Sequence, residues 1–298
     1  MRLIISVLSF IFILALPWVE AKGAAADDPQ SATIGFIPSE DPEILKKNGV
    51  EIAKKLQEKL GVPVNIYVSK NYSGLIDAMK EKKIDFAFLT AATFVFAEKE
   101  AGAKVLLKKV WAGPYYWSTI VTRKASKIKN LRDLKGKRVG FVDEKSASGY
   151  LYPRAAFIKK GLNPDKDFSE VKFFGNHEAT IKALFGGLAD AVAVYADDSK
   201  GKLGAWTEYA TAEQSKQIQS LWVSDPIPND PFCVRQDFYE KHPRFVHDLM
   251  FTLIEMGDEP DSKHSLKKLL GMTTLSTATS KQYEPVRDLV KSLNLKLQ

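Results

Sequence analysis

Two stretches of the sequence follow the same plan: residues 72–88, YSGLIDAMKEKKIDFAF, and residues 177–193, HEATIKALFGGLADAVA. Each begins with an amphipathic segment of helical periodicity. At the same distance from its start, each continues into an apolar segment that begins at an aspartate, Asp85 in one and Asp190 in the other. A helix–strand unit used twice predicts two similar lobes whose equivalent residues face each other across a cleft, although two such units can also match by chance.

The rest of the chain also alternates between helical and strand periodicity. Strands are expected at residues 32–37, 64–68, 84–89, 105–111, 117–122, 139–142, 171–174 and 191–195. Amphipathic helical segments separate several of these strands, and helices dominate after Phe238. This alternation is typical of an α/β fold with largely parallel sheets. A chain of 298 residues is long enough for two lobes that each bury a core.

The composition narrows the class of protein. With 45% hydrophobic and 27% charged residues the chain is globular rather than disordered. Its net charge of +7 comes from lysines spread along predicted helices rather than from one basic stripe, so we expect no nucleic-acid partner. A single cysteine, Cys233, excludes an intramolecular disulfide, and four scattered histidines offer no metal-binding spacing. We therefore expect neither a metal nor a cofactor.

The N-terminus has the pattern of a secretory signal peptide. Residues 1–21 contain a short basic start, an apolar run from Leu3 to Leu16, and small residues at the usual cleavage offsets. The alternative is a membrane anchor, but the run is short for a spanning helix, which needs about 20 residues. No cysteine lies near the cleavage point, so a lipid anchor is not expected. The sequence thus predicts an exported, soluble protein, with residues 22–31 as a flexible segment.

Three predicted helices begin with polar residues, at residues 71–74, 145–150 and 175–177. The N-terminus of a helix exposes unpaired N–H groups and the positive end of the helix dipole, so it binds anions without a formal cation. In open α/β sheets these ends lie beyond the carboxyl ends of the strands, where ligands bind. The hydroxyls of Ser146 and Ser148 would suit a tetrahedral oxyanion, but the same residues could simply cap their helix.

Three further residues are candidates for the same cleft. His177 at a helix start is expected to resist protonation, because the dipole disfavours a cation there, while still donating an N–H to an anion. Asp197 follows a strand at its carboxyl end, and Tyr116 lies where the chain is expected to cross between lobes. Each has a simpler interpretation: a capping histidine, a solvated loop aspartate and a core aromatic ring.

Six short motifs together resemble one family. In order along the chain they are Ser39-Glu40-Asp41-Pro42, Tyr72-Ser73-Gly74, Tyr116-Trp117-Ser118, Ser146-Ala147-Ser148-Gly149, His177-Glu178 and Ile227-Pro228-Asn229-Asp230-Pro231. Their order over residues 32–275 resembles that of the periplasmic phosphonate-binding proteins of ABC importers. The resemblance implies a two-lobed type II binding-protein fold with a hinge and a closing cleft. It places lobe 1 at residues 32–112 plus 223–298 and lobe 2 at residues 113–222.

The resemblance also implies which residues hold a phosphonate. The positions that match the family's contacts to the tetrahedral head are Tyr72, Tyr116, Ser146, Ala147, Ser148 and His177. Ala147 stands where phosphonate binders carry a threonine, so this position keeps its backbone N–H and lacks a hydroxyl. Members that bind aminoalkylphosphonates set two carboxylates against the ligand's ammonium, and these match Asp197 and Asp230, with Asp225 as a rival for the second.

Both acids favour an aminoalkylphosphonate such as 2-aminoethylphosphonate over bare phosphate or phosphite, because two carboxylates near a dianion would repel it. We thus expect a monomeric receptor that delivers its ligand to an ABC permease in the inner membrane. A receptor for phosphite or phosphate, or a ligand-sensing module, is the alternative. A secreted hydrolase built on Ser146 or Ser148, His177 and Asp197 is disfavoured, since the sequence has no Gly-x-Ser-x-Gly elbow.

Overall fold

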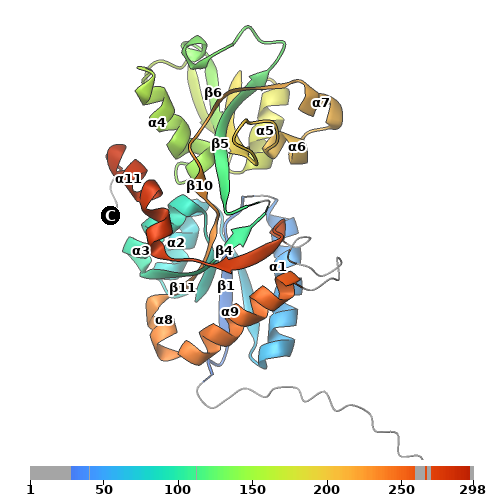
Figure 1. Cartoon of the computed structure of the whole chain (residues 1–298), viewed down its shortest axis with the longest axis vertical. Coiled ribbons are helices and arrows are strands. Elements are labelled where there is room, and N and C mark those ends of the chain that lie inside the picture. The colour runs from blue at the N-terminus through green and yellow to red at the C-terminus, as the bar shows by residue number, and fades with distance from the viewer. Residues whose placement is uncertain (1–27, 40, 112, 259–265, 267–269, 296–298) are drawn as a thin grey trace, which may run out of the picture.

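The computed structural model describes residues 28–39, 41–111, 113–258, 266 and 270–295. The predicted signal peptide, residues 1–21, and the segment from 22 to 27 lie outside this part of the chain. The described residues form two halves, one above the other along the long axis of the molecule (Figure 1). Each half is built on a mixed six-stranded sheet, which confirms the α/β, two-lobed prediction.

The first half contains the lower sheet of Figure 1. Its strands, in spatial order, are β12 (Thr274–Thr277), β4 (Ala103–Val110), β11 (Pro231–Arg235), β3 (Phe86–Phe88), β1 (Ala32–Phe36) and β2 (Val64–Val68). Its helices are α1 (Pro42–Leu60), α2 (Tyr72–Lys80), α3 (Ala91–Ala101), α8 (Gln236–Lys241) and α9 (Pro243–Asp258). β1 is parallel to β2 and β3, and β11 is antiparallel to β3.

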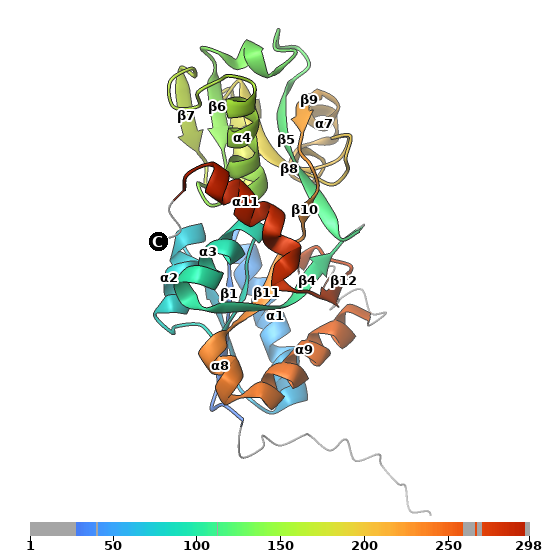
Figure 2. The same cartoon turned by 60° about the vertical axis from the view of Figure 1, so that its left-hand side comes forward.

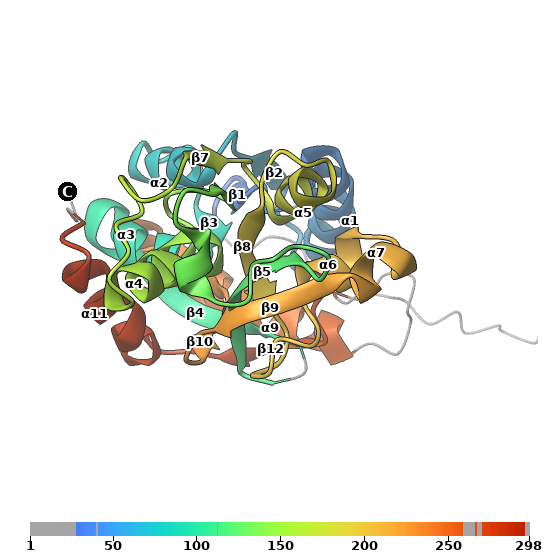
Figure 3. The same cartoon turned by 90° about the horizontal axis from the view of Figure 1, so that it is seen from above.

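The second half contains the upper sheet. Its strands run β10 (Ile227–Pro228), β5 (Tyr115–Arg123), β8 (Ala191–Ala196), β6 (Arg138–Phe141) and β7 (Glu170–Phe173), and β9 (Ile218–Val223) pairs with β5. Its helices are the 3₁₀ turn η1 (Leu131–Leu134), the π turn η2 (Ala147–Leu151), α4 (Tyr152–Lys159), α5 (His177–Phe185), α6 (Ala205–Tyr209) and α7 (Ala212–Lys216). Figure 3 shows this half from above.

The repeat seen in the sequence is also a repeat in space. β6 is parallel to β7 and β8, as β1 is to β2 and β3, and β5 is antiparallel to β8. The repeated aspartates make the same backbone contact, because Asp85 Oδ2 accepts the N–H of Thr33 at 2.9 Å and Asp190 Oδ2 accepts the N–H of Arg138 at 2.9 Å. Each aspartate thereby ties the start of its own strand to the neighbouring parallel strand, which is β1 for Asp85 and β6 for Asp190.

Local sequence signals set the helix ends. The Asp41 carboxylate caps α1 by accepting the N–H of Glu43 at 2.8 Å, Pro42 occupies the first turn, and Gly61 ends the helix with φ of 72°. Among the described residues no helix is both long enough and apolar enough to span a bilayer.

The chain passes between the halves after β4 and returns after β10. β10 pairs with β5 of the upper sheet, and the chain then enters the first sheet at β11. The buried Asn229 joins the two passages, since its Nδ2 donates to the carbonyls of Lys109 at 2.9 Å and Gly113 at 2.8 Å. The two connections are thus hydrogen-bonded to each other at the level of the cleft.

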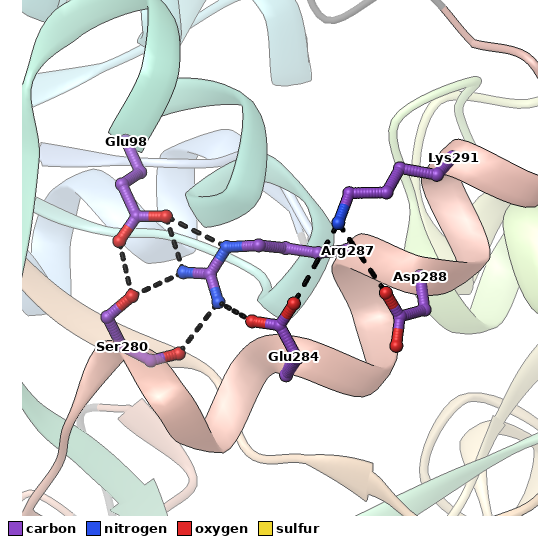
Figure 4. A network of polar contacts seen from close by, with 6 residues as sticks. All are labelled: Glu98, Ser280, Glu284, Arg287, Asp288 and Lys291. Carbon is purple, nitrogen blue, oxygen red and sulfur yellow. Dashed lines mark hydrogen bonds and ion pairs between the residues drawn. The ribbon is translucent and has the colours of Figure 1, made fainter.

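The C-terminal segment lies alongside both halves (Figure 2). It comprises the 3₁₀ turn η3 (Ser280–Tyr283) and α11 (Glu284–Ser292). The Arg287 guanidinium anchors α11 to the first half by contacting the Glu98 carboxylate of α3. It also donates to the Ser280 carbonyl of η3 at 3.0 Å (Figure 4). The apolar face of α11 belongs to a core cluster that includes Ala147 and Leu151 of the second half.

Candidate ligand-binding site

A cavity of about 410 Å³ lies between the two halves. The side chains that line it come from both sheets and include Ser39, Tyr72, Thr90, Lys109, Trp111, Tyr115, Tyr116, Trp117, Ser146, Ser148, His177, Tyr195, Asp197, Glu208, Tyr209 and Asp230. The structure therefore brings together all the predicted contact residues except Ala147, which is buried beside the cavity without lining it. Asp225 is exposed and does not line the cavity.

One end of the cavity is built from helix N-termini. α2, η2 and α5 begin there, each capped by a side chain: Asn71 accepts the N–H of Gly74, Ser146 that of Gly149, and Asn176 that of Ala179. α3 begins there as well, capped by Thr90. The positive ends of these helices and their hydroxyl caps make this end of the cavity attractive to an anion.

The serine turn, residues 146–149, departs from the regular helix expected there. Ala147–Leu151 forms a π turn, and α4 follows with Pro153 in its first turn, where the missing N–H costs nothing. Ser118 on β5 donates its hydroxyl to the Ser148 carbonyl at 2.6 Å and so fixes the turn against the sheet. Ser146 and Ser148 are each only 2% exposed, which leaves their hydroxyls facing the cavity rather than bulk water.

His177 is buried and neutral. Its side chain is 7% exposed, and its Nδ1 atom has no hydrogen-bond partner in the part of the chain that the structure describes. Burial lowers its pKa to about 3, so the expected resistance to protonation holds, with burial rather than the helix dipole as the cause. A buried ring nitrogen without a hydrogen-bond partner destabilises the fold unless a ligand supplies that hydrogen bond.

Two tyrosines lie at the anion-binding end. Tyr116 and Ser148 share a side-chain hydrogen bond, and burial, followed by the charge of Asp230, raises the pKa of Tyr116 well above its usual value. The Tyr116 hydroxyl is therefore a neutral hydrogen-bond donor at neutral pH. Tyr72 is fully buried at the start of α2 and lines the same cavity.

The halves touch at equivalent positions next to this end. The backbone N–H of Tyr72 binds the Asp143 carboxylate of the second half. In the opposite direction, the N–H of His177 donates to the Ser39 carbonyl of the first half at 3.4 Å. Since each contact joins the first residue of a repeated helix to the loop after β1 or β6 of the other half, the structure holds the two halves closed around the cavity.

The cavity also contains carboxylates and one lysine. Asp230 lies beside Lys109, with Nζ 3.7 Å from Oδ2, and both side chains are largely buried. Burial raises the pKa of Asp230, while the Lys109 ammonium and the backbone N–H of Ala91 oppose that shift. Lys109 is the one basic side chain that lines this cavity within the described ranges.

Asp197 has a different setting. It is exposed in the loop after β8, and partial removal from water, followed by the nearby charges of Glu208 and Asp198, raises its pKa to about 6. Glu208, on α6, accepts a hydrogen bond from the Tyr195 hydroxyl at 2.6 Å. The cavity thus combines neutral hydrogen-bond donors at helix N-termini with carboxylates from both halves.

Comparison with known proteins assigns this arrangement to a family. Residues 34–283 match the family described as ABC transporter, phosphonate, periplasmic substrate-binding protein. The chain belongs to this family. It is therefore a binding component of a transport system and not an enzyme.

The relatives of this binding protein span most of its length. It is 28% identical over 292 residues to the phosphonates-binding periplasmic protein of Escherichia coli K12, covering 96% of this chain and 83% of that protein. It is 29% identical over 225 residues to the phosphate-import protein PhnD of Mycolicibacterium smegmatis, covering 69% and 66% of the two chains.

Solved structures support the fold. A binding protein of an ABC phosphonate transporter from Pseudomonas aeruginosa superposes with a TM-score of 0.74 at 25% identity, covering 88% of this chain and 86% of that one. PhnD1 of Prochlorococcus marinus, solved with methylphosphonate, superposes with a TM-score of 0.77 at 21% identity over 90% and 99% of the chains. The type II binding-protein fold is therefore confirmed.

Lys109, Glu208 and Thr90 are among the cavity residues that were not identified from the sequence. Lys109 lies in an apolar run that predicts only a strand, and no local pattern shows that its side chain meets Asp230. Glu208 lies on a short helix without a distinctive motif. Thr90 had a usable signal, because a threonine directly after a strand and three residues before Thr93 is typical of a helix cap. In the described chain, no group of three or more His, Cys, Asp or Glu side chains could hold a metal ion.

Proposed function

We propose that this binding protein captures an aminoalkylphosphonate, such as 2-aminoethylphosphonate, and delivers it to an ABC permease in the inner membrane. The observation that carries the proposal is the polarity of the cavity. Its neutral hydrogen-bond donors suit a phosphonate, and its carboxylates suit an ammonium group. A ligand that carries both groups would satisfy both sets of side chains at once.

The phosphonate would bind to Tyr72, Tyr116, Ser146, Ser148 and His177, with the backbone at Ala147 as a further donor. The unpartnered Nδ1 of His177 supports this assignment, because a buried polar atom needs a hydrogen bond. Neutral donors at helix N-termini hold an oxyanion without a salt bridge. The relative from Escherichia coli is named for phosphonates, which agrees with this ligand class.

The amine would face the carboxylates of the cavity, and the family resemblance offers Asp197 and Asp230 as candidates. A dianion without a cationic group would be repelled by these carboxylates, so phosphate and phosphite are expected to bind more weakly. Contacts from both halves would favour the closed arrangement of residues 32–112 plus 223–298 against residues 113–222. We further propose that the protein is a monomer. Residues 1–21 would direct its export as a signal peptide and would then be cleaved off.

Isothermal titration calorimetry with 2-aminoethylphosphonate, methylphosphonate, phosphite and phosphate tests the proposal. We expect 2-aminoethylphosphonate to bind about tenfold or more tightly than methylphosphonate, because one charge-assisted contact is worth roughly that much. Phosphate should be the weakest of the four. Equal affinity for phosphate and 2-aminoethylphosphonate would contradict the proposal and would favour a phosphate receptor, as the name of the Mycolicibacterium relative suggests for that protein.

A further inference from the structure

The two carboxylates assigned to the ligand's amine are not equally available. Asp230 already has two partners within the protein: the Lys109 ammonium, with Nζ 3.7 Å from Oδ2, and the backbone N–H of Ala91. Ala91 is the first residue of α3, so the Asp230 carboxylate lies at the positive end of that helix. A carboxylate that is compensated in this way has little to gain from an additional cation.

Asp197 has no such compensation. No donor or cation contacts its carboxylate among the residues that the structure describes, and its electrostatic neighbours are two further acids, Glu208 and Asp198. Asp198 is committed to its own loop, since it accepts the N–H groups of Lys200, Lys202 and Leu203. Glu208 lines the cavity together with Asp197. Two adjacent carboxylates therefore face the cavity with no positive charge to offset their repulsion.

The difference follows from the two chain paths. In the first half β3 leads directly into α3, whose N-terminus faces the cavity and donates to Asp230. In the second half β8 leads into a loop that closes on itself, with the Asp197 N–H bound to the Leu203 carbonyl and a bridge between Ala196 and Gly204. α6 begins at Ala205, just after this loop, but within the described residues none of its N–H groups is bonded to the Asp197 carboxylate, so the groups that satisfy Asp230 have no counterpart there.

Tyr195 connects this acidic pair to the anion-binding end. Its ring packs edge-on against the His177 ring, with centroids 4.9 Å apart, and its hydroxyl donates to Glu208 at 2.6 Å. One tyrosine side chain thus spans from the unpartnered histidine to the second carboxylate. A short aminoalkyl chain has about the length of this tyrosine side chain. An ammonium group at the end of the ligand's chain would also lie close to the Tyr195 ring.

We propose that the ligand's amine binds to Asp197 together with Glu208, and that Glu208 is a specificity-determining residue, whereas Asp230 is held by Lys109 as a resident ion pair. This inference rests on the proposed function, because it refines where an aminoalkylphosphonate places its cation. Tyr195 is a positioning residue that orients Glu208. Lys109 keeps the buried Asp230 from adding a third uncompensated negative charge to the cavity.

The test measures the affinities for 2-aminoethylphosphonate and methylphosphonate. The ratio of the first affinity to the second is the measure of amine recognition. The variants are Glu208→Gln, Asp197→Asn, Asp230→Asn and Lys109→Met. Glu213→Gln is the matched control, because Glu213 is an exposed acid on the neighbouring α7 that pairs with Lys216 and does not line the cavity. Thermal unfolding of each variant checks that the fold is retained.

We expect Glu208→Gln and Asp197→Asn each to lower the ratio about tenfold while methylphosphonate affinity changes by less than about threefold. Asp230→Asn and Glu213→Gln should change the ratio by less than about threefold. Lys109→Met should raise the ratio, because it frees Asp230 for the amine. Should Lys109→Met fail to fold, the Lys109→Met, Asp230→Asn double variant removes the ion pair as a unit and should keep the wild-type ratio.

A wild-type ratio well above one that Asp230→Asn abolishes and Glu208→Gln leaves intact would overturn this inference while the proposed function stands. A wild-type ratio near one would instead contradict the proposed function itself.

Discussion

Asp41 in the first half and Ser146 in the second occupy equivalent positions, since Asp41 caps α1 just after β1 and Ser146 caps η2 just after β6. The Asp41 carboxylate accepts the N–H groups of Glu43 and Ile44, and the Ser146 hydroxyl accepts that of Gly149. Only the second cap lines the cavity, and it is 2% exposed. An acid at that place would repel an anion, whereas a neutral hydroxyl adds a donor. The two structurally similar halves thus place different side chains, a carboxylate and a hydroxyl, at the same structural position.

The same contrast appears at the second repeated helix. Tyr72 and His177 are its first residue in the two halves, and both line the cavity. At the ends of β3 and β8 the halves diverge completely, because one continues into α3 and the other into the loop that holds Asp197. The repeat therefore preserves the scaffold, while substitutions at its helix N-termini and strand ends determine which charge each part of the cleft accepts.

The largest expected effect tests whether His177 donates to the phosphonate. His177→Ala should weaken methylphosphonate binding by about 30- to 100-fold, because it removes a donor from a buried site. His177→Asn places an amide nitrogen at the same distance along the side chain as Nδ1 and should recover much of the loss. Calorimetry on both variants measures this effect.

Tyr72→Phe, the equivalent substitution in the first half, serves as the comparison for His177→Ala and should also weaken methylphosphonate. Equal losses in His177→Ala and His177→Asn would show that the ring fills space rather than donates.

Much of the fold was predictable because it is encoded locally and twice. The helix–strand units at residues 72–88 and 177–193 carry periodicity, a polar helix start and a strand-initiating aspartate within each stretch. These signals need no knowledge of distant residues. The alternation of strands and helices and the two-lobed architecture followed from them.

The parts of the site that were not predicted depend on pairings between distant segments. Lys109 meets Asp230 because β4 pairs with β11, where the Lys109 N–H donates to the Asp230 carbonyl at 2.9 Å. Glu208 reaches the cavity because Tyr195, on another element, hydrogen-bonds to it. The π turn at Ala147–Leu151 also has no signal in the periodicity. Side-chain partners fixed by sheet register cannot be deduced from one segment alone.

A smaller effect tests the shared scaffold. Gly35 and Gly140 are equivalent residues of β1 and β6, and neither has room for a side chain. A Cβ atom at Gly35 would lie 2.5 Å from Leu75 Cδ1, and one at Gly140 would lie 2.8 Å from the Phe174 ring. Alanine at either position should lower the free energy of unfolding by about 1 to 3 kcal/mol, as overpacking usually does, which denaturant titration would measure.

Gly74→Ala is the matched control for these two glycines. The added Cβ would lie 3.1 Å from Asn71 Oδ1, and the second half already carries Ala179 at the equivalent place. We expect the free energy of unfolding of Gly74→Ala to change by no more than about 0.5 kcal/mol, since the better helix propensity of alanine offsets the tight contact. A loss as large as that of Gly35→Ala would contradict the structural equivalence of the halves.

The smallest effect distinguishes the two repeated aspartates by its dependence on pH. Hydrogen bonds from the Arg138 guanidinium lower the pKa of Asp190, whereas burial raises the pKa of Asp85 in spite of Arg235. Ionised Asp190 therefore stabilises the fold above its unfolded pKa, and this contribution is lost as the pH falls through the folded value. For Asp85 the contribution is present below the unfolded pKa and is lost as the pH rises through the raised folded value.

Asparagine at each position removes the titration, so the two variants should show opposite trends. Asp190→Asn should be more destabilising near pH 7 than near pH 3.5. Asp85→Asn should be less destabilising near pH 7 than near pH 3.5. Each difference in the free energy of unfolding should be about 1 kcal/mol or less. Urea unfolding of both variants and the wild type at the two pH values measures the trends. Parallel trends would mean that the aspartates share their electrostatics as well as their backbone contact, and the divergence between the halves would then begin only at the cleft.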